Sequence, residues 1–428
     1  MKKVYIYALA YALTAVSCQD NEWGADSATP QAPEIEIPMG AADGELLIKF
    51  VPEMSDILDQ TLTRVGGVAT RSGIPSTDEV LNILGAYHFE RVFPVDPKTE
   101  KRTREAGMHL WYIVRFDKDA DLKEAARQLR KLGEISKIQS NPTLQRAYDP
   151  KKKTLYLSAS DLQHVIRTSE GLTFNDPGLK HQWHYRNAGN YDFVKKDRAE
   201  AIAGADVNCG EAWELCKGDP SIIVAVLDEG VMWSHPDLIA NMWTNEAEEI
   251  GSTEDKDGNG YKGDRYGYNF VKNTGVISWT SADDTGHGTH VAGTIAAENG
   301  NSIGVSGIAG GDGNTGSGVK IMTCQLFDGQ YGATLAAEAK AIKYAADNGA
   351  VVLQCSWGYN SPDANEALGY VPGPKNEQDW ENQYPLEKEA LDYFIHNAGS
   401  PNGVIDGGLA IFASGNEYAP SSSFPAGY

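Results

Sequence analysis

The sequence predicts an α/β protein in which a mainly parallel β-sheet with helices on both faces follows a small α+β domain. From about residue 175 onward, apolar strand-like runs alternate with helical segments such as 336–348 and 387–397. Such alternation is typical of a parallel sheet covered by helices. Earlier in the chain, the elements follow the order strand, helix, strand, strand, helix, strand. We therefore expect a small domain (residues 43–147) and a large domain (residues 175–428).

The first 18 residues have the pattern of an export signal. Lys2 and Lys3 give a positive start, and residues 4–16 form an apolar run that is too short to span a bilayer. The run ends in an Ala-Val-Ser-Cys motif that resembles a bacterial lipobox, in which the cysteine, here Cys18, is acylated. The pattern predicts an exported lipoprotein at the outer membrane or cell surface, with plain secretion as the alternative.

The segments around and within the small domain differ in character. Residues 19–42 are polar and lack periodicity, which predicts a flexible tether. Residues 148–174, with three consecutive lysines, are expected to form a linker where processing occurs. Between them we expect strands over residues 45–51, 87–93, 109–116 and 135–139, and helices over residues 78–84 and 121–132. This order is the split βαβ arrangement of a ferredoxin-like domain.

The composition limits the partners of the protein. With 37 basic and 59 acidic side chains, the net charge is −22, which argues against nucleic acid as a partner.

The Gly-x-Gly-x-x-Gly run at residues 311–316 precedes a strand and does not join a strand to a helix, so we expect no organic cofactor. Cys209 and Cys216 lie on an expected helix, where both would face one way at a distance too long for a disulfide.

A strand-end aspartate and a helix-start histidine carry the strongest functional signal. Residues 221–228 form a mostly aliphatic run that ends in Asp228. Residues 285–294 place His287 at the start of a helix of small residues, with His290 one turn later as the competing histidine. An aspartate can hold an imidazole in one tautomer and stabilise its protonated form, so that the ring can take a proton from a nucleophile.

These motifs resemble those of the subtilisin-like serine proteases, the subtilases. The likeness continues through residues 351–358, similar to the substrate-lining strand of that family, and residues 411–417, similar to its oxyanion-hole segment. The resemblance implies that Asp228 and His287 are catalytic and that Asn416 binds the oxyanion. The fold it implies is the subtilisin-like sheet with helices on both faces.

The resemblance also implies further roles. Ser356, Trp357 and Gly358 would line the substrate site, with Ser356 on the wall of the specificity pocket and not acting as the nucleophile. His290 would face the helix interior in a packing or hydrogen-bonding role. The small domain would be a propeptide that assists folding and temporarily inhibits the enzyme, with an unrelated small binding domain as the alternative.

The nucleophilic serine of the family pattern is not in this sequence. In subtilases it stands in a Gly-Thr-Ser-Met-Ala block after the segment that contains Asn416, and no Gly-Thr-Ser occurs among the 428 residues. We therefore expect a serine endopeptidase whose serine lies beyond Tyr428, so that this chain alone is inactive. The alternative is an inactive, truncated subtilase that serves as a peptide-binding or inert surface lipoprotein.

An acidic loop predicts a calcium site. Asp255, Asp257, Asn259, Tyr261 and Asp264 present oxygen ligands in a run broken by glycine turns, and Ca²⁺ prefers such ligands. A solvated acidic turn is the alternative. The expected partners are thus Ca²⁺, protein or peptide substrates and the propeptide domain, with the membrane contacted only through the lipid anchor.

Overall fold

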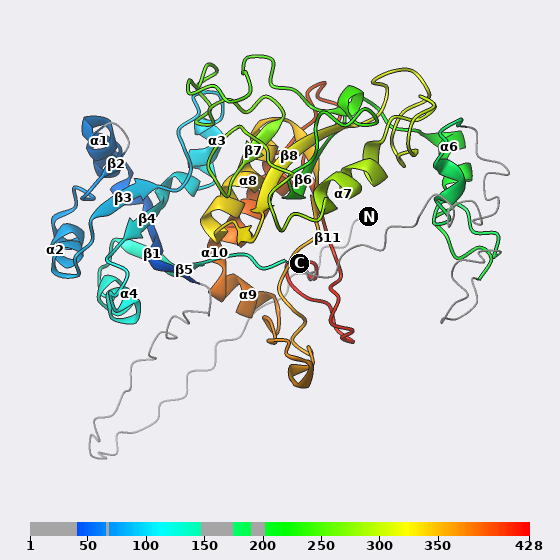
Figure 1. Cartoon of the computed structure of the whole chain (residues 1–428). Helices are drawn as coiled ribbons and strands as arrows, with labels where there is room; N and C mark the ends of the chain where they lie inside the picture. The colour runs from blue at the N-terminus through cyan, green and yellow to red at the C-terminus, as the bar shows by residue number, and fades with distance from the viewer. Residues whose placement is uncertain (1–40, 66–67, 147–173, 190–201) are drawn as a thin grey trace, which may run out of the picture. The chain divides into compact units, whose positions relative to one another are not determined.

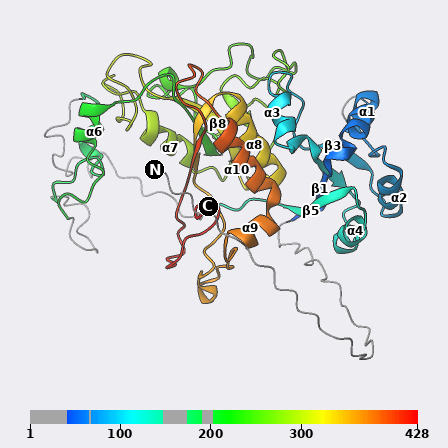
Figure 2. The ribbon, with the colours of Figure 1, turned by 180° about the vertical axis from the view of Figure 1, so that it is seen from behind.

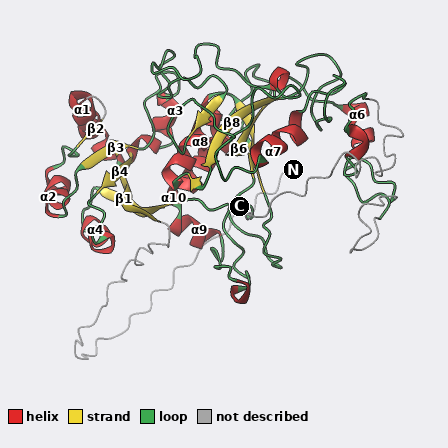
Figure 3. Cartoon of the chain, viewed as in Figure 1, coloured by secondary structure: helices red, strands yellow, loops and turns green. Residues whose placement is uncertain are grey.

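The computed structural model of the chain describes residues 41–65, 68–146, 174–189 and 202–428. Cys18, the expected tether up to residue 40 and the expected linker up to residue 173 lie outside the described residues. Two separate β-sheets occur within the described part, one in each expected domain (Figures 1 and 3). No helix in this part has the length and apolar character needed to cross a membrane.

The small domain contains a five-stranded antiparallel sheet with the order β2-β3-β4-β1-β5. Its strands are β1 (Ala41–Phe50), β2 (Val68–Ala69), β3 (His88–Arg91), β4 (Trp111–Arg115) and β5 (Ile135–Pro142). Its helices are α1 (Ser55–Val65), α2 (Pro75–Ile83), α3 (Glu100–Glu105) and α4 (Leu122–Leu129). Apart from α1, β2 and α3, which were not predicted, this is the expected split βαβ order.

Strand β1, which lies between β4 and β5, is buried on both faces. Leu46, Ile48 and Phe50 belong to a core shared with the helices of the small domain. Leu47 belongs to a different cluster, together with Ile113 of β4 and apolar residues of the large domain. Successive side chains of a strand point to opposite faces, so one face of this sheet packs on its own helices and the other on the large domain.

The large domain contains a sheet with the order β11-β10-β6-β8-β7, and β9 pairs antiparallel with β8. All neighbours along that order are parallel, which confirms the predicted mainly parallel sheet. The strands are β6 (Ile223–Glu229), β7 (Gly267–Asn269), β8 (Lys320–Asp328), β9 (Tyr331–Gly332), β10 (Ala350–Cys355) and β11 (Leu409–Phe412). The helices are α6 (Cys209–Leu215), α7 (His287–Ala296), α8 (Leu335–Asp347), α9 (Glu377–Gln383) and α10 (Pro385–Asn397).

Helices cover both faces of this sheet, as predicted (Figures 1 and 2). On one face, Ala292 of α7 shares an apolar cluster with Val224 and Val226 of β6. On the other face, α8 and α10 pack against each other and their apolar residues join Leu227 and Leu353 in the largest core.

Strand β5 caps two helices of the large domain. Gln139 Oε1 accepts a hydrogen bond from Leu386 N in the first turn of α10, at 2.9 Å. Asn141 Oδ1 accepts one from Ala336 N in the first turn of α8, also at 2.9 Å. The first N–H groups of a helix have no partner inside the helix, so these amide side chains satisfy groups that would otherwise need water or another cap.

The prediction that the side chains of Cys209 and Cys216 face the same way is wrong. Cys209 begins α6 and is buried, whereas Cys216 follows the last residue of the helix in extended backbone and is exposed. Because the helix ends at Leu215, the two side chains do not face the same way. Both are free thiols, so the expectation that they form no disulfide is confirmed.

Candidate active site

Strand β6 brings Asp228 to the carboxyl edge of the large sheet. The strand lies between β10 and β8, and each of its residues is buried, as expected at the centre of a parallel sheet. Asp228 is its second-last residue and is 1% exposed. Its carboxylate accepts a hydrogen bond from Glu229 N at 2.7 Å. Sites in open α/β sheets form at this edge.

Two glycines allow His287 to start α7 beside this strand. Gly286, at the N-cap, has a φ of 79°, a left-handed conformation that favours glycine. Gly288 lies so near the end of β6 that an added Cβ would be 2.1 Å from Glu229 O. A larger residue at position 288 would push the helix start, and His287 with it, away from the strand.

Asp228 and His287 form a hydrogen-bonded pair. His287 Nδ1 lies 2.8 Å from Asp228 Oδ1 and 2.9 Å from Oδ2. Burial of the imidazole opposes its charged form, but the hydrogen bond and charge of Asp228, with Glu229 adding to them, outweigh burial and raise the pKa of His287 above 6.5. Because Nδ1 faces the carboxylate, Nε2 is the nitrogen that can exchange a proton with a bound group.

Comparison with known proteins assigns this region to a family. Residues 219–428, which contain both members of the pair, match the Subtilase family. Residues 219–428 belong to the subtilase family. The matched residues begin just before β6 and include every strand of the large sheet.

Several proteases are similar to this chain. Subtilisin-like protease 1 of Plasmodium vivax is 31% identical over 195 residues, which is 45% of this chain and 26% of that protein. The Thermophilic serine proteinase of Bacillus sp. (strain AK1) is 35% identical over 147 residues, 34% of this chain and 28% of that protein. The PC3-like endoprotease variant B of Hydra vulgaris is 30% identical over 323 residues, 76% of this chain and 33% of that protein. The chain spans about a quarter to a third of the length of these relatives.

The other predicted residues of the subtilase site follow β10 and β11. Both strands run parallel to β6, so their carboxyl ends lie at the edge that holds the Asp–His pair. Ser356, Trp357 and Gly358 come directly after β10. Asn416 lies in the loop after β11 and is exposed, and its backbone N–H donates to Glu417 Oε2 at 2.7 Å.

The three residues after β10 have different surroundings. Ser356 Oγ accepts a hydrogen bond from Gln354 Nε2 at 2.8 Å. Trp357 is buried and packs edge-on against Phe412, with ring centroids 5.2 Å apart. Gly358 is exposed, so its backbone is open to solvent. Trp357 therefore packs the segment after β10 against β11, and Gly358 is the most exposed of the three residues.

The expected packing role of His290 is wrong. The residue is exposed on α7. The face of α7 that packs on the sheet is formed by Gly288, Ala292 and Ala296, which are spaced four residues apart, and His290 lies off that face.

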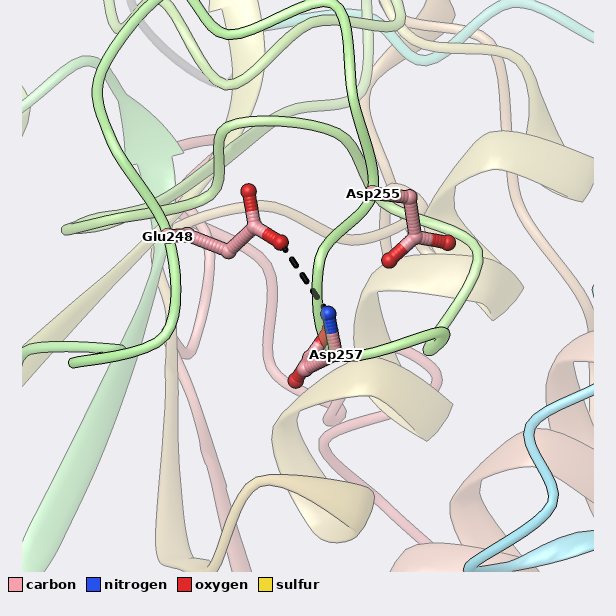
Figure 4. A group of neighbouring side chains, drawn as sticks. All are labelled: Glu248, Asp255 and Asp257. Atoms are coloured by element: carbon pink, nitrogen blue, oxygen red, sulfur yellow. Dashed lines mark hydrogen bonds between the residues drawn. The ribbon is translucent and has the colours of Figure 1, made fainter.

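Three carboxylates gather in the loop before β7 (Figure 4). Ligand oxygens of Glu248, Asp255 and Asp257 lie within 4.8 Å of one another. Asp255 also accepts hydrogen bonds from the backbone N–H groups of Gly258 and Gly260, both at 2.8 Å, which hold the loop around it. A group of carboxylate oxygens fits the ligand preference of Ca²⁺. Sequence reasoning missed Glu248 because it stands before the Asp-rich motif.

Asn259, Tyr261 and Asp264 have structural contacts of their own. Asp264 is buried, and its carboxylate accepts hydrogen bonds from Tyr344 Oη at 2.7 Å and Asn259 Nδ2 at 3.1 Å. Burial raises the pKa of Asp264 to about 6. The ring of Tyr261 packs in the core against Tyr344. Asp264 is thus outside the group of three carboxylates and anchors the loop to α8.

Proposed function

We propose that this chain carries the Asp–His part of a subtilisin-type serine endopeptidase, whose serine is supplied by sequence beyond the 428 residues. The observation that carries the proposal is the 2.8 Å contact between His287 Nδ1 and Asp228 Oδ1 at the carboxyl edge of the parallel sheet. The family match and the similarity to proteases support the same chemistry.

In the proposed reaction, His287 takes the proton of the serine hydroxyl while the serine oxygen attacks the scissile carbonyl. Asp228 orients the imidazole and stabilises the imidazolium. His287 then gives the proton to the leaving amine, and water hydrolyses the acyl-enzyme with the same assistance. The side chain of Asn416 donates to the oxyanion, and an extended peptide lies along residues 356–358.

We further propose that the protein is exported and anchored through Cys18, with the small domain acting as its propeptide. The signal-like start of the sequence supports export. The helix caps that β5 supplies to α8 and α10 support a propeptide that helps the large domain to fold. Ca²⁺ held by Glu248, Asp255 and Asp257 would stabilise the loop before β7.

The test uses the complete natural protein, including its serine. The wild type should cleave casein and react with a fluorophosphonate probe. His287→Ala should lose nearly all turnover, because the members of a triad act as a unit. Asn416→Ala should lower kcat by about 10²–10³-fold with little change in KM, because the oxyanion exists only in the transition state.

His290→Ala is the matched control for these substitutions. Since His290 is exposed, this variant should fold and keep most of its turnover. A well-folded His287→Ala variant with wild-type turnover would contradict the proposal, and so would a wild type that cleaves nothing.

A further inference from the structure

The end of the small domain lies along the large domain in an extended conformation. Leu144 N donates to Ala333 O at 2.9 Å, and Thr143 forms an antiparallel bridge with Thr334. Both partners directly follow β9, so this segment pairs with the large domain through an isolated β-bridge and one further backbone hydrogen bond. Peptides are often bound in this way, by backbone hydrogen bonds to an exposed edge.

Arg146, at the end of this segment, inserts its guanidinium among acceptors of the large domain. Nη1 lies 2.9 Å from Glu229 Oε1, and Nη2 lies 3.6 Å from Asp284 Oδ1. Nη1 also donates to Asp283 O at 3.0 Å, and Nη2 donates to Gly329 O. The Arg146 side chain is 9% exposed and the two carboxylates are each 1% exposed, so these charges meet largely out of water.

The chemistry of this pocket suits a guanidinium group. Two carboxylates and two backbone carbonyls surround one planar cation, and the ring of Phe327 lies 5.6 Å from the guanidinium carbon. A guanidinium has five N–H donors in a fixed plane and stacks on aromatic rings, whereas an ammonium has three donors and no plane. A neutral side chain in its place would remove the charge that compensates two buried carboxylates, which is costly.

The pocket borders the Asp–His pair. Glu229 follows Asp228 directly, and its carboxylate accepts hydrogen bonds from His287 N and Thr285 N, both at 3.0 Å. Asp284 stands three residues before His287 and accepts a hydrogen bond from Gly329 N at 2.7 Å. A side chain held here is therefore next to the position of the scissile bond in the proposed reaction.

We propose that Glu229 and Asp284 form a specificity pocket that selects an arginine side chain in the peptide bound beside the catalytic pair. In this chain Arg146 fills the pocket and holds the end of the small domain against the large domain. Selection of arginine in substrates rests on the proposed function, whereas Arg146 occupies the pocket through the contacts described above.

The substrate test uses the complete, matured natural protein. Its substrates are fluorogenic peptides that contain a single arginine, at a different position in each peptide, and no other charged residue. At a single position, replacement of arginine by citrulline, which keeps the shape but not the charge, should lower kcat/KM by about 10–100-fold, in the range of coupling between close charge pairs. Lysine should be intermediate. Equal cleavage of arginine and citrulline peptides at every position would overturn the inference and leave the proposed function intact.

Variants of the pocket locate the effect. Glu229→Gln and Asp284→Asn should each bring the ratio of kcat/KM for the arginine peptide to that for the citrulline peptide close to 1. Asp284→Asn is needed because Glu229 also accepts a hydrogen bond from His287 N, so Glu229→Gln could disturb the start of α7. Glu246→Gln is the matched control. The carboxylate of Glu246 also pairs with an arginine, Arg265, but its side chain is 75% exposed. This variant should keep the wild-type ratio. A wild-type ratio in both pocket variants would overturn the inference.

The occupancy test needs no catalysis and uses the 428-residue chain. Arg146→Gln should increase the hydrogen-exchange rate of the Leu144 amide by about 10-fold or more, because the last anchor of the segment is lost. Arg146→Lys should cause a smaller increase and Glu246→Gln none. An unchanged rate in Arg146→Gln would overturn the occupancy. If the complete wild type cleaved no peptide at all, the proposed function would fail, and this exchange rate would still decide whether the pocket holds Arg146.

Discussion

The charge state of His287 depends on two acidic groups at the end of β6 and on Arg146 at the end of the small domain. Burial opposes the imidazolium, Asp228 and then Glu229 favour it, and Arg146 opposes it, with a net pKa above 6.5. A histidine whose pKa is raised by folding stabilises the folded state fully below the unfolded-state value of about 6.5, and this contribution is lost as the pH rises through the folded-state pKa. The pair is therefore most stabilising in mildly acidic solution.

We expect Asp228→Asn to lower the pKa of His287, because the group that outweighs burial is lost. Arg146→Gln should raise it, since an opposing positive charge is removed. NMR titration of the ring protons in the 428-residue chain measures both shifts. Asp312→Asn, an exposed change elsewhere, should leave the titration unchanged. A His287 titration that is the same with and without the Asp228 carboxylate would contradict the pairing.

At the scale of elements, helices α8 and α10 bury two glutamates between them. Glu338 and Glu387 are both fully buried, and Trp380 Nε1 donates to Glu387 Oε2 at 2.6 Å. Burial raises the pKa of both carboxyl groups, that of Glu387 to about 7, and the charge of Glu387 raises that of Glu338 further. The folded state then binds more protons than the unfolded state, so stability falls as the pH rises above the ordinary value of 4.5.

Glu338→Gln should therefore raise Tm at pH 8 and change it much less at pH 5. The expected gain at pH 8 is of the order of 1–3 kcal/mol, because a neutral amide replaces a buried group that tends to ionise. Thermal unfolding at the two pH values measures it, with Glu366→Gln as the exposed control. An equal loss of stability at both pH values would show that the carboxyl group makes a contact that the amide cannot replace.

The acidic loop before β7 gives a second prediction at this scale. If Glu248, Asp255 and Asp257 hold Ca²⁺, excess calcium should stabilise the fold by mass action, by about 2.7 kcal/mol at a hundredfold excess over Kd. Thermal unfolding with calcium and with chelator measures the difference. Asp257→Asn should shrink it, while Glu254→Gln, an exposed residue of the same loop, should not. Identical midpoints in both conditions would favour the solvated acidic turn.

At the scale of the whole chain, Glu389 connects α10 to the small domain. Its carboxylate accepts hydrogen bonds from Lys49 Nζ at 2.8 Å, Lys137 Nζ at 3.0 Å and Trp111 Nε1 at 2.7 Å. The side chains of Glu389 and Lys49 are 17% and 15% exposed, so solvent screens this network only in part. The donors come from β1, β5 and β4, and they converge only when the small sheet is formed.

Glu389→Gln should loosen the small domain without unfolding the large one. Loss of a charge-assisted network of this kind costs about 1–3 kcal/mol, so amides of β5 should exchange about 5- to 150-fold faster. Hydrogen exchange measured by mass spectrometry on the 428-residue chain checks this, with Glu366→Gln as control. Unchanged exchange in β5 would mean that the apolar contacts and helix caps hold the domain by themselves.

The sequence alone determined the elements that local patterns encode. The aliphatic run before Asp228 predicts β6, and the small residues after His287 predict α7. Such patterns are visible in the sequence because the buried face of a strand or helix requires apolar or small residues at regular positions. The order of strands and helices was sufficient for both sheet arrangements. Helix α3 was missed because its residues Glu100–Glu105 include five charged side chains and show no apolar period, and β2 is only two residues long.

Only the tertiary structure decided which side chains from distant segments meet. Glu248 joins Asp255 and Asp257, and Arg146 reaches Glu229. Neither of these outcomes leaves a periodic signal, because each depends on how complete elements are placed by the packing of the core. Asp228 and His287 were predictable because each stands at the end of an element with a strong local pattern. The acidic pocket beside them is assembled from a strand end and loops of the large domain, and the arginine that fills it comes from the small domain.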